Sequence, residues 1–338
     1  MLRILLTFCL FLSFCGSLQG GDLSQEEVVV VKSLVDSSTI SKLVERFYPI
    51  KDPVEASVLS IGVNDIYLVR AGNAKYVLRL SRAQKYFEMT PEAFLFELEW
   101  LEFLNSQHIS VSYPIRRIDG ALCGSIQAPE GPRYAALFSF AEGTVELNEE
   151  QAFILGQELA RLHLASNEFA TELPRMHLGV KELVLDPIER IQHFLGDAFQ
   201  EDCARLKEVG EELAGKMAAI EVSTNGYGVI SGDFHGFNQH FTKENRVTMF
   251  DFEFCAYGYR IYDLATFRWS RGSDDLVLWE ELLRGYQTIR PLEEGELESI
   301  DLFVRARHIW WMGILVTFQE YHHQLDAQFW NSAFKRLR

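Results

Sequence analysis

The composition of this 338-residue chain is that of a globular protein, with 48% hydrophobic and 24% charged residues. The length fits one large domain or two lobes. The formal net charge of -16 argues against a nucleic-acid-binding protein, because phosphate backbones are held by clustered Lys and Arg. The five cysteines lie far apart without a CxxC pair, so we expect neither a zinc cluster nor structural disulfides.

The first 20 residues, MLRILLTFCLFLSFCGSLQG, have the pattern of a secretory signal. A charged start at Arg3 precedes an apolar run from Ile4 to Phe14, and small and polar residues follow. The run is too short to span a bilayer well. We therefore treat residues 1–20 as a signal-like or wrongly assigned leader and exclude them from the fold.

The next part of the chain predicts a region rich in strands. A helical pattern covers residues 26–47, and strand-like runs at residues 66–70 and 76–80 are joined by a turn, which predicts a β-hairpin. Because side chains alternate along a strand, Val77 and Arg79 share one face. An arginine is thus directed at whatever that face covers.

A helix is expected to begin at Thr90 and Pro91, a capping hydroxyl followed by proline at the first helical position. Glu97 lies beside the apolar stripe of this helix rather than opposite it. A carboxylate near a buried edge requires a cation, and Arg79 is the candidate. The alternative is an ordinary solvated glutamate.

The chain changes character after the strand expected at residues 134–140, because residues 141–143 break the pattern. The remainder is mostly helical, with helices expected at residues 151–165, 186–195, 201–220 and 294–321, and short strands around Val229 and at residues 239–241 and 247–250. We predict an α+β protein with an N-terminal lobe, residues 21–140, that holds an antiparallel sheet. Residues 141–338 would form a mainly helical C-terminal lobe.

The segment SGDFHGFNQHF, residues 231–241, gathers polar residues on a loop between two strands. Asp233 and Asn238 lie on this loop, and Asp251 begins the segment DFE after a hairpin that returns the chain toward Asn238. An amide and a carboxylate suit Mg²⁺, which is usually held by one or two such groups plus substrate phosphates. Asp233 is then free to accept a proton from a substrate hydroxyl, which is the division of labour that phosphoryl transfer requires.

These motifs resemble one family. GDFHGFN, the hairpin, FDFE at residues 250–253 and YDLA at residues 262–265 are similar to the aminoglycoside phosphotransferase and choline kinase family, which includes type II homoserine kinases. Residues 155–163 are similar to its LGxxLAxLH helix. The resemblance extends from about Leu34 onward and implies a bilobal protein-kinase-like fold. It also implies an ATP- and Mg²⁺-dependent phosphotransferase that acts on the hydroxyl of a small molecule such as an amino alcohol, homoserine or an aminoglycoside.

The resemblance implies roles for particular residues. Asp233 would be the catalytic base, and Asn238 and Asp251 would be the Mg²⁺ ligands. Arg79 would reach the ATP phosphates, and Glu97 would orient it.

The same resemblance assigns further nucleotide contacts to the first lobe. The turn SIGVND, with Gly62 and Asn64, is similar to the family's phosphate-covering turn. The backbone of residues 136–140, which includes Phe138 and Phe140, would face the adenine. Glu253 would contact the metal or the substrate.

Two positions depart from the family pattern. Ser231 stands where the family usually has histidine, and Arg79 stands where lysine is more familiar. Arginine is bidentate and cannot be deprotonated, so we expect phosphate binding to survive with a shifted geometry.

Several polar and aromatic residues have two interpretations. His235 would either touch the substrate or pack within its loop, and Asp263 would brace the catalytic loop rather than catalyse. Trp269 and Trp311 belong either to the core or to a platform for a cationic group. With the acidic composition, such a platform points toward an amine-bearing acceptor, and the oligomeric state is not indicated.

Two other function classes compete with the kinase. GDFHG, residues 232–236, also matches the first metal motif of metallophosphoesterases, in which Asp233 and His235 would bind one of two metals. The further motifs of that fold, a second GD followed by aspartate and a GNH segment, do not occur in the sequence. A nucleotide-binding pseudokinase is the third possibility, although Asp233, Asn238 and Asp251 are all present.

The leader conflicts with ATP-dependent chemistry, because a signal predicts export whereas a kinase needs a compartment that contains ATP. We favour a cytoplasmic enzyme translated from a start between Leu23 and Val31. Export or membrane attachment through residues 1–20 is the alternative.

Overall fold

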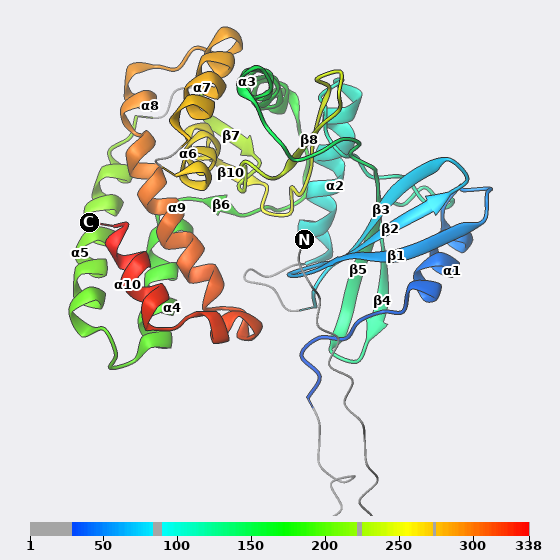
Figure 1. Ribbon diagram of the computed structural model, residues 1–338, viewed down its shortest axis with the longest axis horizontal. Coiled ribbons are helices and arrows are strands. Elements are labelled where there is room, and N and C mark those ends of the chain that lie inside the picture. The colour runs from blue at the N-terminus through cyan, green and yellow to red at the C-terminus, as the bar shows by residue number, and fades with distance from the viewer. Residues whose placement is uncertain (1–28, 84–89, 222–224, 273–274, 338) are drawn as a thin grey trace, which may run out of the picture.

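The computed structural model describes residues 29–83, 90–221, 225–272 and 275–337. An antiparallel sheet with two helices comes first in the chain, and a mainly helical region follows (Figure 1). The fold is therefore the predicted α+β protein-kinase-like arrangement. The leader at residues 1–20 lies outside the described residues.

The sheet has five strands in the order β1-β2-β3-β5-β4. The bounds are Val54–Ile61 for β1, Asp65–Ala71 for β2, Ala74–Leu80 for β3, Gly124–Ala128 for β4 and Gly131–Ser139 for β5. The predicted hairpin is confirmed as β2 and β3, whose turn places Gly72 at φ 57°. The strands β1 and β4 were not expected, although both contain short stretches in which apolar and polar residues alternate.

The two faces of the sheet have different neighbours. Leu78 and Leu80 of β3 are buried in a small core with Ile40 and Val44 of helix α1, Ser37–Phe47. Helix α2, Pro91–Ser106, lies between the sheet and the helical region (Figure 1). The predicted start of α2 is confirmed, because the Thr90 hydroxyl accepts a hydrogen bond from the N–H of Ala93 at 3.1 Å.

The first helix is shorter than predicted. It begins at Ser37 rather than at residue 26, and the described residues 29–36 are not helical. Asp36 caps the helix by accepting a hydrogen bond from the N–H of Ser38 at 2.9 Å. The residues before it include a valine run, whose β-branched side chains disfavour helix, and Lys32 pairs instead with Asp65 of the sheet at 2.9 Å.

The helical region contains more elements than predicted. Its helices are α3 Glu149–Ala165, η2 Ser166–Glu168, η3 Lys181–Leu185, α4 Asp186–Leu195, α5 Gln200–Ala218, α6 Arg260–Arg271, α7 Leu276–Ile289, α8 Glu294–Glu298, α9 Ile300–Leu315, η4 Gln319–Gln324 and α10 Ala327–Lys335. Helices α6, α7 and α10 were missed. The single helix predicted at residues 294–321 is wrong, because a Glu293 and Glu296 capping box begins α8 and Ser299 separates α8 from α9.

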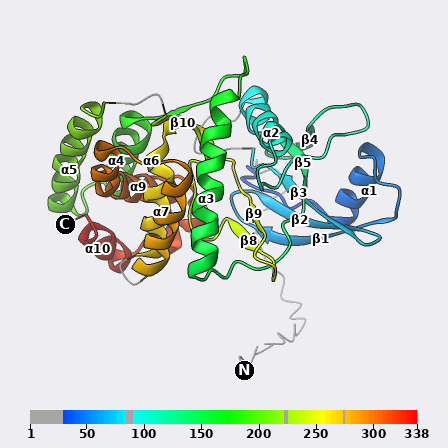
Figure 2. The ribbon, with the colours of Figure 1, turned by 90° about the horizontal axis from the view of Figure 1, so that it is seen from above.

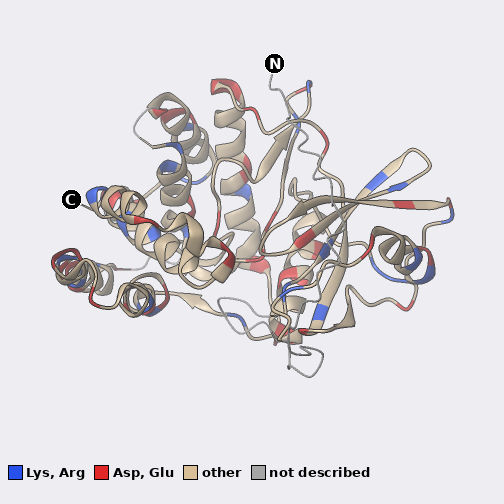
Figure 3. Ribbon diagram, turned by 60° about the horizontal axis from the view of Figure 1, so that its bottom comes forward, with Lys and Arg blue, Asp and Glu red and all other residues tan. Residues whose placement is uncertain are grey.

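Two small sheets carry the loop segments of the helical region. One has the strands β6 His177–Leu178, β10 Ala256–Tyr259 and β7 Tyr227–Ile230, and the other pairs β8 Gln239–Phe241 with β9 Val247–Met249. The predicted strand near Val229 and the predicted hairpin are confirmed, and β6 and β10 were not expected. Acidic and basic positions are interleaved over both regions of the described chain (Figure 3).

Three cysteines, Cys123, Cys203 and Cys255, lie in the described part of the chain, and none of them forms a disulfide. Within that part, no helix combines the length and the apolar character needed to cross a membrane.

Helices α3 and α7 lie side by side (Figure 1 and Figure 2). Each contributes a glycine to the contact: a Cβ added at Gly156 would lie 2.0 Å from the carbonyl oxygen of Leu282, and one at Gly285 would lie 2.0 Å from that of Phe153. The helices can therefore approach this closely only because both positions lack a side chain.

Replacing Gly156 by alanine should destabilise the protein. The added methyl group meets backbone rather than a flexible side chain, so we expect a loss of about 1–3 kcal/mol in the free energy of unfolding, typical of overpacking. Gly215→Ala in α5 is the control, because nothing lies within 4 Å of its Cβ. It should be neutral or stabilising by up to about 1 kcal/mol. Equal effects of the two substitutions in denaturant titrations would contradict this account.

His308 joins three helices. Its Nδ1 accepts a hydrogen bond from Trp269 Nε1 of α6 at 3.1 Å, and its Nε2 donates to the carbonyl of Ala333 in α10 at 2.9 Å. Acceptance of the Trp269 hydrogen bond at Nδ1 requires the neutral ring, and burial lowers the pKa of His308 from 6.5 to about 4.

The low pKa of His308 predicts a pH dependence of stability. The unfolded chain takes up this proton below pH 6.5 and the folded chain only near pH 4. Stability is therefore lost as the pH falls through this range, by about 3 kcal/mol at most from this group. Glutamine can make both hydrogen bonds without titrating, so His308→Gln should show a shallower loss in thermal unfolding between these pH values. Identical pH profiles of the two proteins would refute the assignment.

Candidate active site

A buried ion pair links the sheet to α2. Arg79 of β3 donates from Nη1 and Nη2 to the two carboxylate oxygens of Glu97, at 2.8 and 2.6 Å. Burial alone would lower the pKa of Arg79, but the adjacent carboxylate of Glu97 outweighs this and raises it. The predicted pairing is confirmed, and the solvated alternative for Glu97 is wrong.

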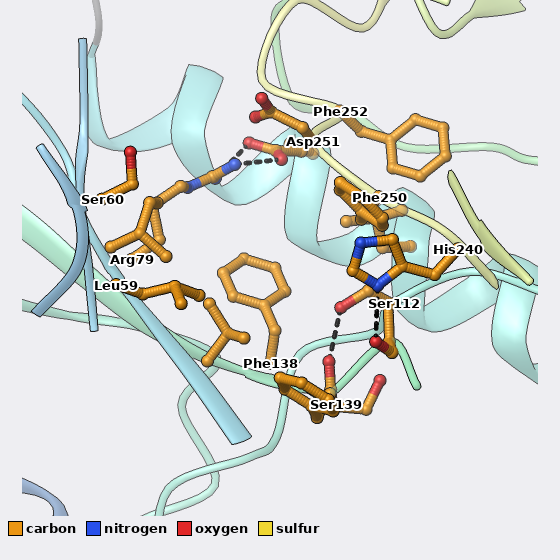
Figure 4. Close-up of a pocket in the computed structure, with 16 residues that line it drawn as sticks. Leu59, Ser60, Arg79, Ser112, Phe138, Ser139, His240, Phe250, Asp251 and Phe252 are labelled. Atoms are coloured by element: carbon orange, nitrogen blue, oxygen red, sulfur yellow. Dashed lines mark hydrogen bonds and ion pairs between the residues drawn. The ribbon is translucent and has the colours of Figure 1, made fainter. Parts of the chain in front are cut away.

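The first cavity lies against this ion pair and has a volume of about 300 Å³. Its walls are largely apolar side chains, among them Val77, Phe138, Phe140 and Phe250. Phe138 lies beneath the Arg79 guanidinium, with 5.0 Å between the Arg79 Cζ and the ring centre. Figure 4 shows Arg79 reaching toward the end of the cavity occupied by Asp251. This flat, apolar slot with a guanidinium at one end suits a purine attached to an anionic chain.

The opposite side of the first cavity is formed by the end of β5 and its neighbours. Ser112 donates from its hydroxyl to the carbonyl of Ser139 at 2.7 Å, and His240 Nδ1 contacts the carbonyl of Ala141 at 2.8 Å (Figure 4). These bonds fix the backbone at the end of residues 136–140, the segment that was expected to face the adenine. His240 orients this segment from the β8–β9 hairpin.

The catalytic loop predicted at residues 231–241 is held from below by Asp263 of α6. Its two carboxylate oxygens accept hydrogen bonds from the N–H groups of Ser231 and Gly232, at 2.8 and 2.9 Å. Gly232 has φ 74°, and an added Cβ would lie 2.0 Å from the carbonyl of Phe254, so only glycine fits there. Asp263 is thus a structural brace, as predicted.

Asp263 is itself held by a buried chain of hydrogen bonds. His163 Nε2 lies 3.0 Å from its Oδ2, and His163 Nδ1 lies 2.7 Å from the hydroxyl of Tyr286. Burial lowers the pKa of His163, so the neutral ring donates from Nε2 to the carboxylate and accepts the Tyr286 hydroxyl at Nδ1. The helices α3 and α7 therefore set the position of the loop.

Asp233 projects from this loop into a second cavity. Its Oδ1 accepts a hydrogen bond from Nη2 of Arg307 in α9, and its Oδ2 lies 3.9 Å from Nε2 of His235. Burial lowers the pKa of His235, which makes the imidazole neutral. One carboxylate oxygen of Asp233 is thus fixed by a cation, and the other forms no ion pair with a Lys or Arg of the described residues.

Asn238 and Asp251 meet as predicted from the hairpin. The N–H of Phe250 donates to the carbonyl of Asn238 at 3.0 Å, which brings the residue before Asp251 against the loop. The side-chain amide of Asn238 donates to the carbonyl of Asp233 at 3.1 Å, which orients its oxygen. Asp251 itself has φ 63°, in the left-handed region, which aspartate tolerates better than most residues.

Three carboxylates converge around Asp251. Enclosure in the cleft, followed by repulsion from Glu253, raises the pKa of Asp251 to about 7, and Asp233 contributes in the same direction. Because the Asp251 side chain is open to the water of the cavities, we attribute the rise mainly to repulsion. A hard cation with oxygen ligands would relieve this repulsion, so Asn238 and Asp251 fit Mg²⁺.

The second cavity has a volume of about 560 Å³ and lies between the glycine turn and α9. The turn residues Gly62 and Asn64 line this cavity rather than the first. Asn64 Nδ2 donates to Oε2 of Glu253 at 2.7 Å, while the buried Oδ1 of Asn64 has no hydrogen-bond partner in the described residues. The turn therefore covers one side of the acidic cluster, which consists of Asp233, Asp251 and Glu253.

The two cavities share Ser60, Ile66 and Asp251. Asp251 consequently lies where the contents of one cavity meet those of the other. The carboxylates of Asp233 and Glu253 and the guanidinium of Arg79 surround this junction.

The predicted tryptophan platform is already occupied. The Cζ atoms of Arg307 and Arg336 lie 5.0 and 5.8 Å from the ring centre of Trp269. Trp311 stacks on His308, with the ring centres 5.7 Å apart. Both indoles line the second cavity, but the cations over Trp269 are the protein's own.

Sequence reasoning missed three arginines of the site. Arg307 and Arg336 lie in the second cavity, and buried Arg175 donates to the main-chain carbonyls of Glu253, Cys255 and Ala93, which ties the acidic segment to α2. Of these three arginines, only Arg307 had a feature in the sequence that could have drawn attention to it, because it lies within the apolar pattern of residues 300–315.

The comparisons with known proteins agree with this geometry. The sequence profile of the phosphotransferase enzyme family matches residues 56–297. An uncharacterized protein of Deinococcus radiodurans is 32% identical over 290 residues, which cover 84% of this chain and 83% of that protein. A homoserine kinase of Paraburkholderia xenovorans is 27% identical and covers 81% of this chain and 84% of its own.

Among solved structures, a microcompartment-associated aminopropanol kinase has the same fold. It superposes with a TM-score of 0.73 at 22% identity, and the match covers 89% of this chain and 94% of that one. Fold and family are those of a kinase, so the metallophosphoesterase interpretation of residues 232–236 is wrong. The chain therefore belongs to the phosphotransferase enzyme family, and it is a small-molecule kinase with a protein-kinase-like fold.

Proposed function

We propose that this kinase transfers the γ-phosphate of ATP to a hydroxyl group of a small molecule, with Mg²⁺ as its metal and Asp233 as its base. The observation that carries the proposal is the junction of the two cavities at Asp251. One cavity suits a nucleotide, the other suits an acceptor, and an acidic cluster lies between them.

ATP binds in the first cavity under this proposal. The adenine lies among Val77, Phe138 and Phe140, and the triphosphate extends toward Arg79. Glu97 holds that guanidinium in place through two hydrogen bonds, and its buried Nε–H has no acceptor among the described residues. Donors therefore remain for a phosphate oxygen.

Asn238 and Asp251 are the proposed Mg²⁺ ligands. When bound there, Mg²⁺ would neutralise the charge of the phosphates. Asn64 and Glu253 lie across the same junction and close it on the side of the acceptor.

Asp233 prepares the acceptor for reaction. Its Oδ1 is held by Arg307, so its other oxygen receives the proton of the acceptor hydroxyl. The hydroxyl oxygen then forms a bond to the γ-phosphorus as the bond from that phosphorus to the leaving oxygen of ADP breaks. Such positioned bases accelerate reactions by about 10²–10⁴-fold.

The acceptor is a small molecule with a hydroxyl group. Homoserine, named for one relative, and aminopropanol, named for one solved structure, are the first compounds to examine, together with aminoglycosides.

Removing the charge of Asp251 should abolish Mg²⁺-dependent nucleotide binding. We expect ATP with Mg²⁺, at about 100 times its Kd, to stabilise the protein by about 2.7 kcal/mol, a rise in melting temperature on the order of 5 °C. Asp251→Asn should lose this rise, because asparagine keeps the left-handed backbone but not the charge. Asp197→Asn, at an exposed position, is the control and should keep it. No rise in the unaltered protein with any nucleotide and Mg²⁺ would sink the proposal.

Asp233→Asn should separate chemistry from binding. Because Asp233 serves the acceptor rather than the nucleotide, the variant should keep the melting-temperature rise with ATP and Mg²⁺. Its rate of ADP formation with an acceptor should fall by about 10²–10⁴-fold. A variant as active as the unaltered protein would show that Asp233 is not the base, and an unaltered protein that binds ATP but forms no ADP with any acceptor would favour a pseudokinase.

A further inference from the structure

The acidic side chains of the second cavity are all engaged. Asp233 pairs with Arg307, Glu253 accepts a hydrogen bond from Asn64, and Asp251 is the proposed metal ligand. The cavity lining includes no fourth Asp or Glu. No carboxylate of the described lining therefore remains to bind the ammonium group of an acceptor.

The basic side chains of the same cavity are less engaged. Arg336, at the end of α10, is exposed and forms no ion pair with any carboxylate in the described part of the chain. Its single hydrogen bond goes to the carbonyl of Trp269 at 3.4 Å. Its guanidinium can thus bind a ligand anion without breaking an ion pair within the protein.

Arg307 adds a second positive charge to this end of the cavity. It is 2% exposed, lies 4.4 Å from the ring centre of Trp310, and gives one nitrogen to Asp233. Its Nε and Nη1 have no acceptor with regular hydrogen-bond geometry among the described residues, although the Tyr262 hydroxyl is close. The guanidinium is held rigidly with part of its donor capacity unused.

The indole of Trp269 cannot serve as a platform for a ligand cation in this arrangement. The guanidiniums of Arg307 and Arg336 both lie over it. An ammonium group brought to this ring would meet two like charges, which is destabilising.

From these charges we propose that the acceptor is a short hydroxy acid whose carboxylate binds Arg336 in the field of Arg307, while its hydroxyl group reaches Asp233. The inference rests on the proposed function, because it takes the second cavity as the acceptor site. The acceptor is short because Arg336 lies over the same Trp269 ring as Arg307, at 5.8 and 5.0 Å from the ring centre, and Arg307 contacts Asp233 directly. Arginine suits this role because its planar donors match a carboxylate.

This inference decides between acceptors that the relatives leave open. Homoserine carries a carboxylate, whereas aminopropanol does not, and both are named among the similar proteins. The arginines of this chain favour the carboxylated type. The sequence predicted an amine-bearing acceptor. The cavity changes this prediction, because an amino group alone would leave Arg307 and Arg336 without an anionic partner on the acceptor.

The test uses matched pairs of acceptors that differ only in the carboxylate. Serine, threonine and homoserine are each compared with the amino alcohol that decarboxylation would give, for example serine with ethanolamine. The full chain is assayed with ATP and Mg²⁺ for kcat/KM with each compound. We expect at least one acid to be phosphorylated with a kcat/KM about tenfold or more above that of its partner, as one charge-assisted contact would produce.

Arg336→Gln should remove this preference and Lys335→Gln should not. Both substitutions remove one positive charge from the exposed end of α10, but only Arg336 lines the cavity. In Arg336→Gln we expect KM for the acid to rise about tenfold while kcat and the use of the amino alcohol stay near their original values. Arg336→Lys should recover part of the loss.

Three outcomes would overturn the inference. Equal kcat/KM values for the amino alcohols and the acids would show that the protein does not recognise the carboxylate. A preference for the acids that Arg336→Gln leaves unchanged would show that Arg336 does not bind the carboxylate. If neither these six compounds nor 3-hydroxypropanoate and 4-hydroxybutanoate, the counterparts of serine and homoserine without the amino group, are phosphorylated, a short hydroxy acid is ruled out. In each case the stabilisation by ATP and Mg²⁺ is measured on the same samples, and its absence would instead indicate that the proposed function has failed.

Discussion

The buried ion pair between Arg79 and Glu97 is the contact on which the rest of the site depends. It joins the central strand of the sheet to α2, at 2.8 and 2.6 Å, and α2 in turn packs into the core of the helical region. A buried charge without its partner is strongly destabilising. Each side chain therefore constrains the other, and together they set the depth of the first cavity and the direction in which Arg79 presents its donors.

A second set of contacts fixes the backbone of the catalytic loop. Asp263 fixes two consecutive N–H groups of the loop, and His163 and Tyr286 fix Asp263. The backbone of the loop is thereby held rigidly, and the side chains of Asp233 and Asn238 can still change their orientation. The carboxylates of Asp233 and Glu253 repel that of Asp251, and the proposed Mg²⁺ would relieve this repulsion.

The side chains that line the second cavity change from negatively to positively charged over a short distance. One part of its lining carries the carboxylates of Asp233, Asp251 and Glu253, and another carries Arg307 and Arg336. The overall charge of -16 gives no hint of this reversal, because net charge describes solubility and long-range attraction rather than the groups within one cavity. Under the proposal made above, selectivity for an acceptor therefore depends on a few side chains of α9 and α10.

The sequence by itself determined the features whose cause is local. The β2–β3 hairpin, the capped start of α2 and the loop with Asp233 and Asn238 follow from alternation, capping and turn residues, and pairing Arg79 with Glu97 needed only the two faces that these patterns define. Tertiary structure decided the rest. Arg175, Arg307 and Arg336 reach the site from distant elements, and Lys32, which precedes α1, pairs with Asp65 of the sheet. Such contacts depend on how elements pack, which no periodicity within one segment encodes.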